Sequence, residues 1–265
     1  LGFGFRAGFL GLLHLEITQE RLRREYDMDV IVTVPSVAYR VTTARDTALI
    51  IKGPHELPDP SHIKHTEEPW MSVDIITPRE YVGGIMQLTA DRRGRYRTTE
   101  YLSVGQRAIL RYDIPLAALI VDFYDALKSA SAGYASLNYE LKGYETTDIV
   151  RLDILVADRP VEELATIVWR DAAYAAGKRI VETLKDTLPR QQFVIKIQAA
   201  VGGKIIAADR VASFRKDVTA KLYGGDVTRK NKLLDKQKKG KKRMRASGTV
   251  EIPPEAYLAV LKKKD

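Results

Sequence analysis

The spacing of apolar positions changes several times along the chain, and each change marks an expected element. Residues 3–9 predict a short strand, which turns at Gly11 into a helix whose apolar side chains recur every three to four positions. The β-branched run at residues 30–34 predicts a second strand, which continues past Pro35 through Val37, Tyr39 and Val41 in alternation. Two strands and one helix make a thin core, so we expect residues 1–43 to be the second half of a domain whose first half lies upstream.

The next part of the chain joins a polar stretch to a regular unit. Residues 44–67 contain several prolines around one short apolar run at residues 49–51, which predicts a linker with a small hairpin. Residues 68–148 then predict the order β-α-β-β-α-β, that of a ferredoxin-like or split βαβ unit. The expected elements are residues 71–76, 79–90, 96–102 and 107–114, a helix with Leu116, Leu119, Ile120, Phe123 and Leu127 on one face, and residues 135–144.

The last part, residues 149–265, predicts a domain with a different order of elements. We expect strands and helices in alternation, so the fold class of the whole chain is α+β. The expected elements are a strand at 152–156, a helix at 161–188, a strand at 193–199, a helix with Val211, Phe214, Val218 and Leu222 inward that ends at Gly224 and Gly225, a strand at 249–252 and a helix after Pro254.

One stretch near the C-terminus carries the net charge of the whole chain. Residues 229–245, here named the basic segment, hold ten cations against one acid, Asp235, and their net charge of +9 equals that of all 265 residues. The formal net charge of all residues outside the basic segment is therefore zero. The ten cations are Arg229, Lys230, Lys232, Lys236, Lys238, Lys239, Lys241, Lys242, Arg243 and Arg245.

The basic segment needs a polyanionic partner, because its own charges repel one another. Most charge runs are solvated loops, but here ordered structure is expected on both sides, as for a tethered loop leading into a helix. Aromatic residues do not interleave with the cations, which favours the backbone or shape of structured RNA over base stacking. An anionic membrane surface is the alternative, although only Leu233, Leu234 and Met244 offer apolar anchors there.

No motif in the sequence indicates catalysis. Gly177-Lys178 and Gly203-Lys204 lack the earlier glycine and the following hydroxyl residue of a phosphate-binding loop. The absence of cysteine excludes disulfides, thiol catalysis and cysteine-ligated zinc, and we interpret the histidines of the proline-rich stretch as solvated. No apolar run approaches eighteen residues, so no transmembrane helix is expected.

Three stretches resemble the elongation factor 4 (LepA) family of translational GTPases. Residues 1–26, LGFGFRAGFLGLLHLEITQERLRREY, resemble the ferredoxin-like domain III of the family, although Ala7 stands where a cysteine is expected. Residues 67–94, EEPWMSVDIITPREYVGGIMQLTADRRG, resemble domain V, which is shared with elongation factor G. Residues 223–245, YGGDVTRKNKLLDKQKKGKKRMR, followed by GTVEIPPEAYLAVLK at 248–262, are similar to the family's own C-terminal domain.

This resemblance implies a role on the ribosome. It implies half of domain III, a complete domain V and a C-terminal domain that reaches the acceptor end of a tRNA, in a factor that uses GTP to reposition tRNAs. GTP and Mg²⁺ would bind in an N-terminal domain that the sequence does not include, so we expect no cofactor and no catalytic residue here. The family implies a cytoplasmic protein, peripheral on the cytoplasmic membrane face in some descriptions, and we expect a monomer.

Overall fold

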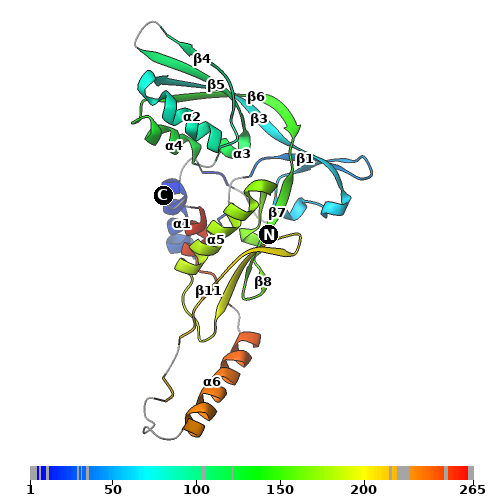
Figure 1. The fold of residues 1–265 in the computed structure, drawn as a ribbon, viewed down its shortest axis with the longest axis vertical. Helices are drawn as coiled ribbons and strands as arrows, with labels where there is room; N and C mark the ends of the chain where they lie inside the picture. Colours follow the sequence, from blue (N-terminus) through cyan, green and yellow to red (C-terminus); the bar gives the residue numbers. More distant parts are fainter. Residues whose placement is uncertain are drawn as a thin grey trace.

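The protein is a mixed α+β fold with two antiparallel sheets, which confirms the expected class (Figure 1). The computed structural model describes residues 5, 7–9, 12–28, 30, 32–33, 36–102, 106–120, 122–214, 217–219, 227–247 and 250–261.

The first sheet is built around one long strand. β3 pairs with β1 over its first residues and with β5 and β6 further along, and β2 and β4 complete the order β2-β1-β3-β5-β4. Its strands are β1 (Tyr39–Thr43), β2 (Ala48–Ile51), β3 (Ile63–Pro78), β4 (Arg95–Tyr101), β5 (Arg107–Pro115) and β6 (Ser136–Thr146).

The second sheet has the order β11-β10-β7-β8, with β9 paired to β7. Its strands are β7 (Ile149–Val156), β8 (Arg159–Pro160), β9 (Thr166–Trp169), β10 (Ile195–Val201) and β11 (Lys204–Val211). The described α-helices are α1 (Leu12–Tyr26), α2 (Val82–Asp91), α3 (Leu116–Leu119), α4 (Phe123–Ala130), α5 (Ala173–Thr187), α6 (Val227–Ser247) and α7 (Pro254–Leu261).

The first core lies between the first sheet and the helices α2 and α4. Alternate residues of β3, including Val73 and Ile75, are fully buried on this side, as a strand with one covered face requires. They pack with Phe123 and Leu127 of α4 and Ile85 of α2. The element order from β3 to β6 is the predicted β-α-β-β-α-β, and β2 occupies the predicted apolar run and pairs with β1.

The second core lies under α5. Helices α5 and α7 pack on β7 and β10 through buried residues such as Ile154, Leu184, Ile197 and Val260. Gly177 is required here, because a Cβ at this position would lie 2.8 Å from the Cβ of Ala199. A third cluster, which joins Tyr39 and Ile51 of the first sheet to Ile149 and Ile167 of the second, connects the two sheets.

One predicted helix of the C-terminal part is wrong in extent, and another is not found at its described positions. The helix predicted from residue 161 begins only at Ala173, because the β-branched and aromatic run of β9 instead pairs with β7. The helix predicted around Val211 is wrong as well, since Val211 ends β11, and residues 212–214 and 217–219 are not helical. Leu222, Gly224 and Gly225 lie outside the described residues.

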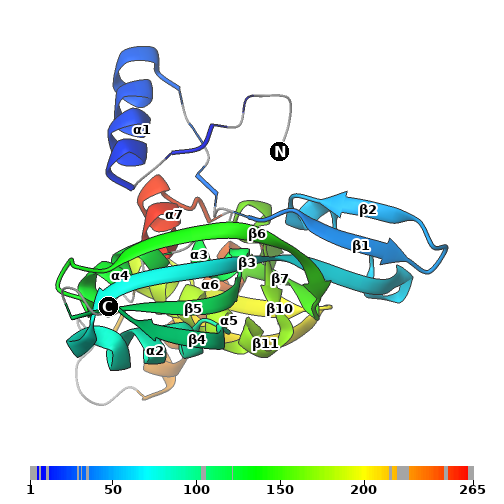
Figure 2. The same ribbon diagram turned by 90° about the horizontal axis from the view of Figure 1, so that it is seen from above.

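Smaller corrections concern three predicted strands and one helix. Phe5 and residues 7–9 form no strand, and neither do residues 250–252. Val30, Val32 and Thr33 form none either, but the predicted continuation of that strand is confirmed at Tyr39 and Val41, which lie in β1. The other positions of the predicted strands 3–9, 30–34 and 249–252 lie outside the described residues. The single helix predicted over 116–127 is divided into α3 and α4, because Asp122 adopts a left-handed conformation with φ 55°. The predicted helix of the N-terminal part is confirmed as α1, which stands apart from both sheets (Figure 2).

Candidate nucleic-acid interface

The basic segment lies within one helix, α6, so the predicted loop is wrong. Lysine, arginine, leucine and glutamine all favour helix, and the segment contains one glycine, Gly240, and no proline. The prediction overestimated the repulsion between like charges, which costs only about 0.2–0.5 kcal/mol for each neighbouring pair on a helix. Figure 1 shows α6 clear of both sheets, with its N-terminal end farthest from them.

Five of the ten predicted cations form a row along α6. They are separated by three or four residues in turn, the spacing that places side chains on one side of a helix, and all five are exposed. At 1.5 Å per residue the row is about 21 Å long, with a cation every 4.5–6 Å or so. The members of this cation row are Arg229, Lys232, Lys236, Lys239 and Arg243.

The remaining predicted cations do not share this side. Lys238 and Lys242 are exposed beside the row, whereas Lys230 and Lys241 are half-buried on the side that also carries the two leucines of α6. The side chain of Arg245 lies outside the described residues. The structure therefore separates cations that face solvent from cations that face the protein, a distinction that charge counting cannot make.

Lys241 contacts the body of the protein directly. Its ammonium group donates one hydrogen bond of 2.8 Å to Oγ of Ser213 and one of 2.7 Å to the carbonyl oxygen of Phe214. Both acceptors lie on the segment that follows β11.

Two cations on the first sheet form ion pairs with acids of the same sheet. Nζ of Lys142 lies 2.8 Å from Asp113 and 2.9 Å from Glu145, and these hydrogen bonds, Asp113 foremost, raise the pKa of Lys142. The bond from Lys142 also lowers the pKa of Glu145. Arg111 lies 3.2 Å from Glu100. Lys142 and Arg111 are therefore each held beside a carboxylate.

Comparison with known proteins identifies the family. Residues 65–155 match the family model described as elongation factor G C-terminus, and residues 156–262 match that of the GTP-binding protein LepA C-terminus. The chain is 56% identical over 262 residues to an elongation factor 4 from Acetivibrio thermocellus, covering 99% of this chain and 43% of that protein. It is 54% identical over 265 residues to an elongation factor 4 from Acaryochloris marina, covering 100% of this chain and 44% of that protein.

The chain belongs to the elongation factor 4 family. The resemblance of the three stretches is thereby confirmed, and the chain is a C-terminal part of a translation elongation factor that spans less than half the length of the curated relatives it matches. Helix α6 and its cation row lie in the region that matches the LepA C-terminus.

Arg93 forms an ion pair with a buried carboxylate of its own matched region and also contacts a tryptophan of the other matched region. Arg93 donates two hydrogen bonds, of 2.6 and 3.2 Å, to the carboxylate of Glu68, which is only 2% exposed. The same guanidinium lies 4.4 Å from the ring centre of Trp169, which belongs to the second sheet. Burial, with the charge of Glu68 adding to it, raises the pKa of the neighbouring Tyr39 far above its usual value. No pattern in the sequence indicated this contact.

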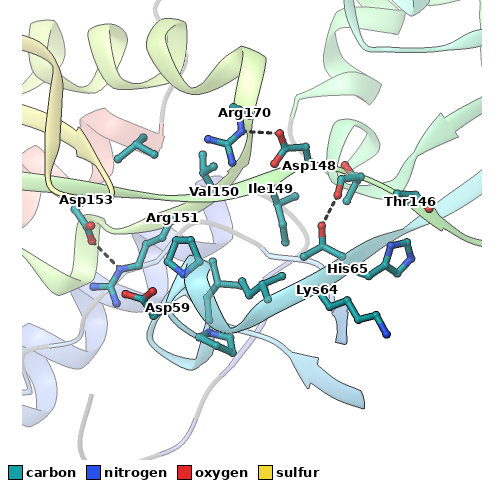
Figure 3. A pocket seen from close by; sticks show the side chains of 18 residues that line it. Asp59, Lys64, His65, Thr146, Asp148, Ile149, Val150, Arg151, Asp153 and Arg170 are labelled. Carbon is teal, nitrogen blue, oxygen red and sulfur yellow. Dashed lines mark hydrogen bonds and ion pairs between the residues drawn. The ribbon is translucent and has the colours of Figure 1, made fainter. Parts of the chain in front are cut away.

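A groove of about 740 Å³ lies where the two regions meet (Figure 3). It is lined by the loop before β3, the start of β3 and the first residues of β7. Two ion pairs lie within it, one between Arg170 and Asp148 and one between Arg151 and Asp153.

Among the described residues, no three His, Asp or Glu side chains are grouped so that they could hold a metal ion. Within the same described part of the chain, no helix is both long and apolar enough to cross a bilayer.

Proposed function

We propose that the cation row of α6 binds the phosphate backbone of structured RNA on the ribosome, with tRNA as the partner. The observation that carries this proposal is the arrangement of the row: five exposed cations on one side of a helix that stands clear of the body. Backbone contacts of this kind supply affinity without reading sequence. Membership of a translation factor family supports the ribosome as the place of binding.

The fold around α6 supports a finer assignment of domains. From β3 to β6 the strand order β6-β3-β5-β4, with the helices on one face, is that of a ferredoxin-like unit, so we assign residues 68–148 to domain V. Residues 1–43 are then the second half of domain III, residues 44–67 a connection, and residues 149–265 the C-terminal domain. Domain V and the C-terminal domain form the base from which α6 extends.

The activity of the whole protein is proposed from the family alone. One matching family model is described as a GTP-binding protein, so we propose that the complete factor is a GTPase and that GTP and Mg²⁺ bind outside this chain. In this account the chain contributes binding and no catalytic residue. Nothing in the comparisons supports the alternative of an anionic membrane surface as the partner.

The test replaces three lysines of the row with alanine: Lys232, Lys236 and Lys239. Binding of the full chain to a labelled 12-base-pair RNA hairpin is followed by fluorescence anisotropy between about 50 and 300 mM salt. Three lost phosphate contacts should reduce the slope of log K against log salt by about 2 to 3 and weaken binding on the order of 100-fold near 0.1 M salt.

A matched control removes the same charge from another surface: Lys178, Lys196 and Lys204, all exposed in the C-terminal domain, are replaced with alanine. This variant should keep the slope of the unmodified protein. Equal losses in both variants would mean that net charge alone drives binding and would refute the proposal, as would a row variant with an unchanged slope.

A further inference from the structure

We infer that Lys241 is a positioning residue that sets the direction of α6, and not one of the phosphate contacts. This inference rests on the RNA-binding function proposed above. It assigns two roles within the basic segment: contact with phosphate by the cation row, and orientation of the helix by Lys241. Lys241 and Lys242 are neighbours in sequence with the same chemistry, yet Lys241 is half-buried and Lys242 is exposed. Two hydrogen bonds, of 2.8 and 2.7 Å, commit the Lys241 ammonium to the protein.

The acceptors of Lys241 are firmly held. Ser213 and Phe214 follow directly after β11, whose last residue, Val211, is buried in the second core. The amide of Phe214 donates a hydrogen bond of 2.8 Å to the carbonyl oxygen of Gln191, which precedes the buried Phe193. Lys241 therefore ties α6 to a segment that is connected to the core on two sides.

The position of Lys241 along the helix makes this contact effective as a pivot. Fourteen residues separate it from Val227 at the far end of α6, which corresponds to about 21 Å of helix. A change of 20° in the helix direction would therefore move the far end by about 7 Å, more than the spacing between neighbouring cations of the row. Holding the angle keeps the row in register with the phosphates of a rigid partner.

A lysine that holds the helix and a lysine that contacts RNA differ in a measurable way. A phosphate contact releases counterions, so its loss lowers the salt slope by about 0.7–0.9. Loss of a positioning contact leaves the number of phosphate contacts unchanged and adds an ordering cost, so it lowers affinity at every salt concentration by a similar factor.

The experiment compares four variants in the full chain with the same RNA hairpin. Lys241→Met should weaken binding several-fold with an unchanged salt slope, whereas Lys239→Met, which removes a member of the cation row, should lower the slope by about 0.7–0.9. Ser213→Ala removes one acceptor without any change in charge and should weaken binding in the manner of Lys241→Met. Lys241→Arg, which keeps a cationic donor at this position, should restore affinity.

A second readout follows the helix itself. The chain has no cysteine, so Asn231→Cys and Gln192→Cys, both at exposed positions, allow two spin labels to report the distance between α6 and the body. Lys241→Met should broaden this distance distribution, and Lys239→Met should leave it unchanged. A slope lowered by Lys241→Met, or no change in affinity and distance for both Lys241→Met and Ser213→Ala, would overturn the inference.

The two proposals fail separately. If the three-lysine row variant keeps the salt slope of the unmodified protein, the RNA-binding function is wrong. The spin-label distances then still decide whether Lys241 holds α6, because they need no RNA.

Discussion

Arg93 contacts residues of both sheets. Its positive φ of 63° turns the chain after α2, so that the guanidinium reaches both Glu68 and Trp169. The carboxylate it pairs with is buried, and a buried charge without a partner is far more costly than the net value of the pair. Removal of one partner should therefore have a larger effect than removal of both.

We predict that Arg93→Ala destabilises the protein by about 3–5 kcal/mol at neutral pH, because it leaves Glu68 charged and buried without a partner. The double variant Arg93→Ala with Glu68→Gln should recover part of this loss. Urea unfolding, followed by tryptophan fluorescence, measures both values. Arg21→Ala breaks an exposed helix pair with Glu25 and serves as the control, for which no measurable change is expected. A double variant less stable than Arg93→Ala would contradict this account.

At the scale of the element, α6 is a helix that is destabilised by repulsion between its own cations. Cations four residues apart repel one another at several positions, for instance Lys232 with Lys236 and Lys239 with Arg243, and each such pair costs about 0.2–0.5 kcal/mol. Salt screens this repulsion, since the Debye length falls to about 8 Å at physiological ionic strength. Salt also weakens phosphate binding, so it acts on α6 in two opposite directions.

We predict that raising salt from about 20 to 300 mM increases the helical content of α6 while it weakens RNA binding. The two effects are separated by circular dichroism on the protein alone and by anisotropy with the RNA hairpin. Gly240→Ala is a suitable comparison: a Cβ there has nothing within 4 Å, and alanine should favour the helix by about 1 kcal/mol at any salt concentration. Helicity that falls as salt is added would refute the repulsion argument.

The elements also show which signals in the sequence were strong. The helical spacing in α1 was sufficient for a correct prediction, because its apolar stripe is clear. Alternation predicted only residues 71–76 of β3, which begins at Ile63 within the stretch predicted as a linker. Strand β11 was missed although Gly202 and Gly203 precede it; both adopt positive φ in a two-residue turn that pairs β10 with β11. Strand β9 was assigned to a helix because four residues carry too little periodicity to be recognised alone.

For the site, the sequence was sufficient to find the basic segment but not to divide it. Ten cations and one acid are visible by inspection, whereas the burial of Lys241 depends on where the chain after β11 lies in space. The same holds for Arg93, whose partners come from β3 and β9. Contacts between elements distant in sequence decide both roles, and no local pattern reports them.

At the scale of the whole molecule, the two sheets form the stable part and α6 the exposed part. Strands β7 and β10 contribute fully buried residues to the second core, whereas most side chains of α6 are exposed. Local stability should follow this division, because segments with few buried apolar contacts open more easily.

We predict that backbone amides of α6 exchange with deuterium within seconds to minutes. Those of β7 and β10 should need hours or longer. Addition of the RNA hairpin should slow exchange in α6 and leave α1 unchanged, since α1 is another exposed helix and serves as an internal reference. Mass spectrometry of peptic fragments measures both. Protection that appears equally in α1 and α6 would indicate general binding of RNA to the surface.

The charge distribution described for this chain also determines how a partner is approached. Because the basic segment holds the entire net charge and extends from one end of the molecule, the protein has a large permanent dipole. In the field of a polyanion this dipole produces a torque that turns α6 forward before any contact is made. Orientation of this kind accelerates productive encounters. Much of the dependence of binding on ionic strength should therefore appear in the association rate, with α6 reaching the polyanion before the two sheets do.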